Sequence, residues 1–237
     1  MELVFVDESG DTKFEGYFGL CVAAVNVAHY KGIKEGFQSI LRESEWDETI
    51  EFKGSHLFSA SKGDTNVTIE SRIDIASKVL DLNKSSSNAR MRFHYVRHHN
   101  CEDPKDEYLA CLPLLIEKAL LKPKKGKGKD VVAVSCDFRN DIKAREIQEA
   151  ILPKVTGKGY TLLEEVTTPH SNFETVGILY ADIVSYLSAR IDTISNDVEL
   201  FENIPPDQLE NIGKVKKLKS SQTLIKRVKS LDRYIVE

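Results

Sequence analysis

Four carboxylates stand at scattered positions whose surroundings favour a shared metal site. Asp7 and Asp137 each follow directly on an apolar run, Asp182 lies inside an almost wholly apolar segment, and Glu51 is the fourth. Hard divalent cations such as Mg²⁺ take oxygen ligands, and two such ions can clamp the attacking and leaving oxygens of a phosphodiester. We therefore predict that these four residues bind Mg²⁺ or Mn²⁺ and catalyse phosphodiester hydrolysis.

Among the four carboxylates, Asp182 is the one whose sequence surroundings most strongly favour a functional role. Between Thr175 and Ala189 it is the only ionisable acid or base apart from tyrosines. A helix that is apolar nearly all round is usually buried, and a buried carboxylate costs several kcal/mol unless it is paired or binds a metal. Ser171 and Glu174 match the S-x-x-E capping box and predict the start of this helix.

Two further side chains have types suited to the same chemistry. If the segment around Glu51 is extended, Lys53 points to the same side, where its ammonium would stabilise a phosphate beside the metal. A surface ion pair is the alternative for this E-x-K spacing. His170 precedes the late helix and is placed to assist a proton transfer, with an ordinary loop residue as the alternative.

The elements that must position these residues follow from the hydrophobic periodicity. Short apolar runs at 3–6 and 17–26, with turn-type residues at 9–11, predict an N-terminal hairpin. Further helices are expected at 30–45, 67–82, 107–121, 143–155 and 173–191, and further strands at 90–98, 130–138 and 160–167. This order predicts an α/β fold with a mixed β-sheet and flanking helices. If the strands before Asp7 and Asp137 are parallel neighbours, both carboxylates face one crevice; the alternative is that each simply opens a turn.

Length and composition limit the class of protein. The chain has 237 residues, 41% of them hydrophobic and 30% charged, which suits one domain over residues 1–195 with a charged, partly helical extension over 196–237. No apolar run approaches the roughly 18 residues of a membrane helix, and the N-terminus does not resemble a signal peptide. The four cysteines form no CxxC pair, so we expect a reduced, cytoplasmic protein with no membrane partner.

Basic residues are concentrated in two segments although the net charge is −4. Local basic patches on an acidic chain can still bind a phosphate backbone. The residues expected to contact nucleic acid, DNA or RNA, are Lys124, Lys125, Lys127, Lys216, Lys217, Lys219 and Arg227. The alternatives are a solvated loop and a solvated tail, or a tail that caps the fold or binds a partner protein. A homo-oligomer is also open for the protein.

Several short motifs, in this order along the chain, resemble the domain-of-unknown-function family 3800. They are FVDESGD at 5–11, EFKGS at 51–55, an aspartate after an apolar strand at 137, and YADIVSY at 180–186. The resemblance covers residues 3–190. It implies a ribonuclease-H-like fold, a two-metal nuclease-type site built from Asp7, Glu51, Asp137 and Asp182, and a setting in bacterial defence or mobile-element loci. The chain departs from the family at Leu179-Tyr180, where the family usually has Gln two residues before Ala-Asp.

Three other functions remain open from the sequence. A haloacid-dehalogenase-type phosphatase would use Asp7 as nucleophile with Asp137 and Asp141 on metal, although Ser9 stands where its acid would be. A non-catalytic module that binds nucleic acid or protein is the second alternative. A zinc site is the third, from His94, His98, His99 and Cys101, although strand spacing separates these residues.

Overall fold

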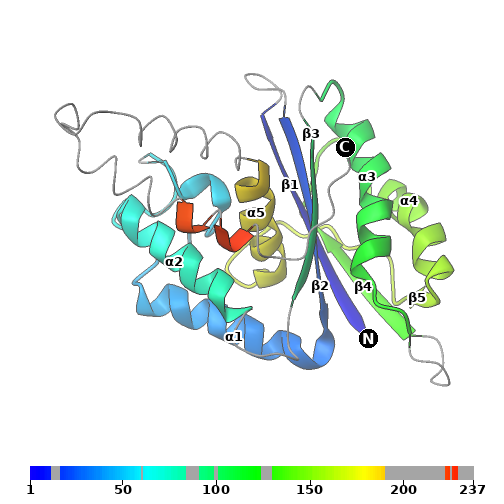
Figure 1. The fold of residues 1–237 in the computed structure, drawn as a ribbon, viewed down its shortest axis with the longest axis horizontal. Coiled ribbons are helices and arrows are strands. Elements are labelled where there is room, and N and C mark those ends of the chain that lie inside the picture. The colour runs from blue at the N-terminus through cyan, green and yellow to red at the C-terminus, as the bar shows by residue number, and fades with distance from the viewer. Residues whose placement is uncertain are drawn as a thin grey trace.

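The computed structural model describes residues 1–11, 17–59, 61–83, 91–98, 101–123, 130–189, 222–224 and 226–228. Its centre is a five-stranded sheet in the order β3-β2-β1-β4-β5 (Figure 1). The strands are β1 (Glu2–Asp11), β2 (Tyr17–Asn26), β3 (Arg92–His98), β4 (Asp130–Cys136) and β5 (Tyr160–Leu162). β1 pairs antiparallel with β2 and parallel with β4, so the sheet is mixed.

Helices cover both faces of this sheet (Figure 1). One face carries α1 (Val27–Glu43), α2 (Ile69–Leu82) and α5 (Val176–Ala189), and the other carries α3 (Pro104–Ala119) and α4 (Ala144–Gly157). Because successive strand residues point to opposite faces, β1 supplies Phe5 to the core under α5 and Val4 and Val6 to the core under α3 and α4. The expected mixed α/β sheet with an N-terminal hairpin and flanking helices is confirmed.

Two local expectations were wrong. The turn expected at residues 9–11 does not form, because β1 continues through Asp11 and Glu8 and Ser9 pair with Leu20 and Gly19 of β2. The strand expected at 160–167 shrinks to the three residues of β5, followed by one isolated bridge between Ser135 and Thr167. The hydrogen-bonded pairing along the whole β1–β2 ladder outweighs the turn preference of residues 9–11.

Most of the basic residues expected to bind nucleic acid lie outside the described residues. This applies to Lys124, Lys125, Lys127, Lys216, Lys217 and Lys219. Arg227 is described, and its Nη2 lies 2.6 Å from Oδ2 of Asp81 on α2. Its neighbours Leu224 and Val228 are fully buried in the core under α5, so this part of the predicted extension packs on the domain. Within the described part of the chain, no helix combines the length and apolar character needed to cross a bilayer.

Candidate metal centre

β1 and β4 bring Asp7 and Asp137 to neighbouring positions. The parallel ladder between these strands runs as far as Val6 and Cys136, and the backbone N–H of Asp137 then donates to the carbonyl of Val6 at 2.9 Å. The two strands are therefore parallel neighbours, as the crevice hypothesis requires. Asp7 itself lies in the middle of β1 opposite Cys21, not at the strand's end.

α5 places Asp182 against this pair from the layer above the sheet. All fourteen residues of α5 are buried, as the apolar sequence predicts, and Asp182 is only 9% exposed. The helix lies directly on β1, since a Cβ at Gly177 would collide with the ring of Phe5. The charge of Asp182 accordingly acts on Asp7, which is itself 4% exposed.

The segment that contains Glu51 and Lys53 lies over the same helix. It leads into the short 3-10 helix η1 (Gly54–His56), and the backbone N–H of Gly54 donates to Oδ2 of Asp182. Only glycine fits here, because a Cβ would overlap the side chain of Tyr186. Lys53 Nζ lies 2.9 Å from Glu51 Oε2, so the two side chains form the ion pair that was the alternative for this spacing, and their charges act on Asp182.

The charge balance of this cluster is strongly negative. Burial raises the pKa of Asp7 well above its ordinary value, and Asp182, Glu8 and Asp137 raise it further. Burial also raises the pKa of Asp182 to about 6, against the lowering effects of the Gly54 hydrogen bond and Lys53. The Lys53 ammonium is opposed by its own burial, but its hydrogen bond to Glu51 and the nearby aspartates raise its pKa overall. The buried aspartates therefore lack enough compensating positive charge.

Ser171 and Glu174, which precede α5, do not form the helix cap that was expected of them. The capping box predicted from Ser171 and Glu174 was wrong: the helix begins at Val176, the Ser171 hydroxyl donates to Glu51 Oε1 at 3.0 Å, and Glu174 pairs with Lys34 at 2.7 Å. Both side chains therefore bind residues distant in the sequence instead of capping the helix. Ser171 instead fixes the free oxygen of Glu51.

His170 is exposed and packs its ring on Phe138, with 4.3 Å between ring centroids. Phe138 follows Asp137, so this contact places His170 beside the chain just after β4.

Sequence reasoning missed Glu8 and Arg139, which flank the cluster on the opposite face of the sheet. Glu8 Oε1 lies 2.9 Å from Arg139 Nη1, and burial raises the pKa of Glu8 to about 7 although Arg139 opposes the rise. Arg139 also stacks over Tyr108 at 5.0 Å and binds Asp141 at 2.7 Å. The sequence signal that could have pointed to Glu8 is its position next to Asp7 at the end of an apolar run. The engagement of Asp141 with Arg139 disfavours the phosphatase reading, which needs Asp141 on a metal.

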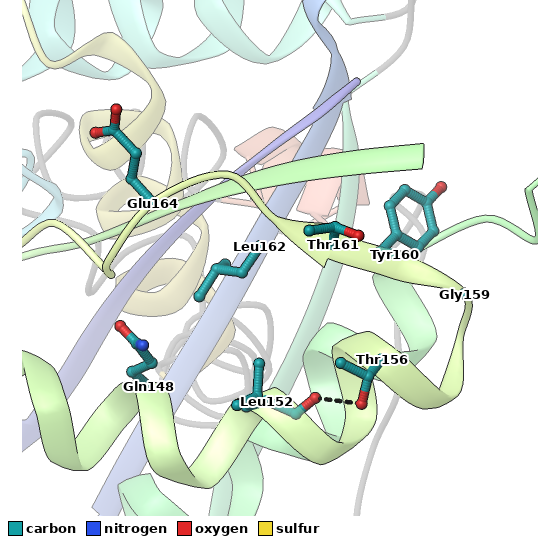
Figure 2. Close-up of a pocket in the computed structure, with 8 residues that line it drawn as sticks. All are labelled: Gln148, Leu152, Thr156, Gly159, Tyr160, Thr161, Leu162 and Glu164. Carbon is teal, nitrogen blue, oxygen red and sulfur yellow. Dashed lines mark hydrogen bonds between the residues drawn. The ribbon is translucent and has the colours of Figure 1, made fainter. Parts of the chain in front are cut away.

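A separate pocket of about 460 Å³ lies between β5 and the end of α4 (Figure 2). Its lining residues are Gln148, Leu152, Thr156, Gly159, Tyr160, Thr161, Leu162 and Glu164. β5 pairs with the first residues of β4, whereas Asp137 follows the last. The pocket is therefore at the other end of β4 from the acidic cluster.

No protein-family model matches the chain, and neither does any curated protein. Solved structures that resemble it include a chain of the PCNA:RNase HII complex from Archaeoglobus fulgidus, with 14% identity, a TM-score of 0.44, and 92% of this chain and 87% of that chain covered. The ribonuclease H2 of Pyrococcus horikoshii OT3 has 11% identity and a TM-score of 0.39, with 97% and 100% covered. Bst-RNase HIII in complex with Mn²⁺ has 12% identity and a TM-score of 0.38, with 98% and 70% covered. The observed strand order and pairing confirm the mixed α/β fold that was expected from the sequence.

Proposed function

We propose that this chain is a divalent-metal-dependent nuclease whose site is formed by Asp7, Glu51, Asp137 and Asp182. The observation that carries the proposal is the interaction of Asp7 and Asp182, two buried carboxylates from different layers, next to the half-buried Asp137. Clustered buried carboxylates are unfavourable unless a cation compensates them. Their oxygen ligands suit Mg²⁺ or Mn²⁺ rather than a soft metal.

Each residue of the site has a distinct task in this proposal. Bound Mg²⁺ or Mn²⁺ would activate a water molecule and stabilise charge on the phosphate. Asp7 and Asp182 are held rigidly, the first by the β-ladder and the second by the Gly54 N–H, so they fix the position of the site. Glu51 is oriented by Ser171, and Lys53 beside it would contact a phosphate oxygen. His170 would move a proton between solvent and the scissile group.

The experiment that tests the proposal is cleavage of labelled single-stranded, duplex and hybrid DNA and RNA with Mg²⁺ or Mn²⁺. We expect metal-dependent cleavage of at least one substrate by the wild type, and loss of that cleavage in Asp182→Asn. Asp74→Asn is the matched control, because Asp74 is exposed on α2 and pairs only with Lys78 in the described structure. Binding of nucleic acid that is indifferent to metal and to Asp182→Asn would instead support a non-catalytic binding module.

The wider setting is also a proposal. The motifs at residues 5–11, 51–55 and 180–186 support membership of the domain-of-unknown-function family 3800, and with it a role in bacterial defence or mobile-element systems. A nucleic acid is the proposed partner, with DNA and RNA both open, together with a protein partner or a second copy of the chain. All four cysteines are free thiols, which is consistent with a reducing cytoplasm.

A further inference from the structure

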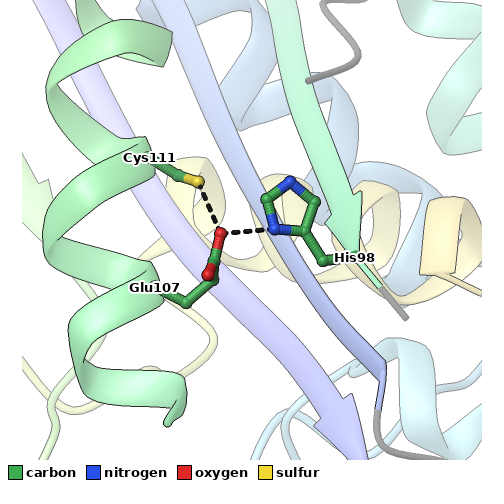
Figure 3. A group of neighbouring side chains, drawn as sticks. All are labelled: His98, Glu107 and Cys111. Carbon is green, nitrogen blue, oxygen red and sulfur yellow. Dashed lines mark hydrogen bonds and ion pairs between the residues drawn. The ribbon is translucent and has the colours of Figure 1, made fainter. Parts of the chain in front are cut away.

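A second group of metal-ligating side chains lies on the α3 side of the sheet (Figure 3). His98 ends β3, while Glu107 and Cys111 stand one helical turn apart on α3. Nδ1 of His98 contacts Oε1 of Glu107, and Sγ of Cys111 donates to the same oxygen at 3.1 Å. One ligand atom from each residue lies within 4.8 Å of the other two.

This group is separate from the acidic cluster. His98 shares a face of β3 with Val96, which packs in the core under α3, whereas Asp7 and Asp182 meet on the α5 face. The ligand types differ as well: the group offers an imidazole, a thiol and one carboxylate. The inference therefore does not depend on the proposed nuclease activity.

We propose that His98, Glu107 and Cys111 form a zinc-binding site. Thiolate sulfur, imidazole nitrogen and carboxylate oxygen are the three ligand types that Zn²⁺ takes in proteins. A neutral imidazole with a thiolate and a carboxylate balances the two positive charges of the ion, so the cation could be partly buried at little electrostatic cost. These three residues leave the fourth tetrahedral position to a water molecule.

In the metal-free structure the side chains of His98 and Cys111 both contact the same oxygen of Glu107. Glu107 Oε1 accepts from the thiol and meets the imidazole, so both contacts converge on a single oxygen. Nδ1 is the ring nitrogen of His98 that faces Glu107 and Cys111, whereas the buried Nε2, on the far side of the ring, has no hydrogen-bond partner among the described residues (Figure 3). Binding of Zn²⁺ would form a bond to Cys111 Sγ and release the thiol proton to solvent, with no electron transferred.

Such a site would join the end of β3 to the first turns of α3. The three ligands span residues 98–111, so the ion would close the connection between the two elements. Closed zinc sites contribute directly to folding stability. We assign the site a structural role on the edge of the sheet.

The test uses Co²⁺ as a spectroscopic substitute in the full-length, chelator-treated protein. A thiolate bound to Co²⁺ gives a near-ultraviolet charge-transfer band that carboxylates do not produce. We expect the wild type to develop this band with one equivalent of Co²⁺, to lose it on adding Zn²⁺, and to keep it in excess Mg²⁺. Cys111→Ser should abolish the band and weaken Zn²⁺ binding by more than about tenfold.

Two matched variants distinguish thiolate coordination at Cys111 from Co²⁺ binding at another cysteine or in the acidic cluster. Cys136→Ser makes the same change at another buried cysteine on the same face and should keep the band. Asp182→Asn should also keep it, even though it is expected to abolish the activity proposed above. The proposal is overturned if the wild type shows no band, or if the band survives in a folded Cys111→Ser. If Cys111→Ser does not fold, His98→Gln replaces it, with the same loss expected.

Discussion

Neutralising Asp182 should stabilise the metal-free protein at neutral and alkaline pH. Burial raises the pKa of this carboxyl from its ordinary 3.8 to about 6 in the folded protein. A group that holds its proton more tightly when folded makes the folding free energy less favourable as pH rises between those two values. A tenfold change in acidity corresponds to about 1.4 kcal/mol, so the ionised side chain costs the fold about 3 kcal/mol.

Asn in place of Asp182 removes this charge while keeping the shape and an oxygen to accept from the Gly54 N–H. We expect Asp182→Asn to be more stable than the wild type by up to about 3 kcal/mol near pH 8 in chelator, and the difference to vanish near pH 4. Urea denaturation followed by circular dichroism measures both values. Excess Mg²⁺ should stabilise the wild type and not the variant, since a ligand that binds only the folded state stabilises it by mass action.

Asp141→Asn is the control for a general effect of removing negative charge. Arg139 lowers the pKa of Asp141 by a direct hydrogen bond, so its neutralisation should not stabilise the protein at any pH. If Asp182→Asn is less stable than the wild type near pH 8 in chelator, the reasoning fails. Asp182 would then be a structural anchor whose ionised form is needed to bind the Gly54 N–H.

The remaining predictions concern the metal, the Glu51 segment and the chain end. Millimolar Mn²⁺ should raise the melting temperature of the wild type in calorimetry, and an unchanged value with no heat of binding would contradict the metal site. Glu51→Gln should abolish cleavage and Lys53→Ala should weaken it less, whereas wild-type cleavage in Glu51→Gln would remove this segment from the site. Cutting the chain after Ile212 should lower stability in urea, because it removes two fully buried apolar side chains worth about 1.5–3 kcal/mol each. A truncated protein of unchanged stability, with a flatter dependence of nucleic-acid affinity on salt, would instead support the prediction that Lys216, Lys217, Lys219 and Arg227 contact a phosphate backbone.

The fold was largely predictable because its main elements carry strong local signals. β2 was predicted with its bounds correct, and α5 could be recognised because its residues are apolar on every face. β5 was overestimated because its continuation pairs only through the bridge between Ser135 and Thr167. A residue makes strand pairing only where a partner strand is present, and that partner is set by the tertiary fold.

The candidate site was predictable to the extent that each residue stood out from its neighbours. Asp182 is conspicuous as a charge in an apolar helix. The Gly54 N–H that holds it comes from 128 positions earlier in the chain, and no sequence pattern connects the two. Glu8 was missed because a charged residue directly before turn-type residues is typical of a solvated turn. Its burial follows from the continuation of β1 through Asp11.

The zinc alternative from the sequence grouped His98 with His94, His99 and Cys101, whose spacing along a strand separates them. The structure shows a different grouping, in which a helical i, i+4 pair meets the end of the preceding strand. The two candidate sites lie on opposite faces of one sheet and differ in ligand hardness. Mg²⁺ prefers oxygen ligands and does not replace a cation held by the Cys111 thiolate, whereas the four carboxylates of the acidic cluster supply oxygen ligands. Each site thus discriminates by its own ligand chemistry, and the Co²⁺ charge-transfer band should respond to changes at Cys111 but not at Asp182.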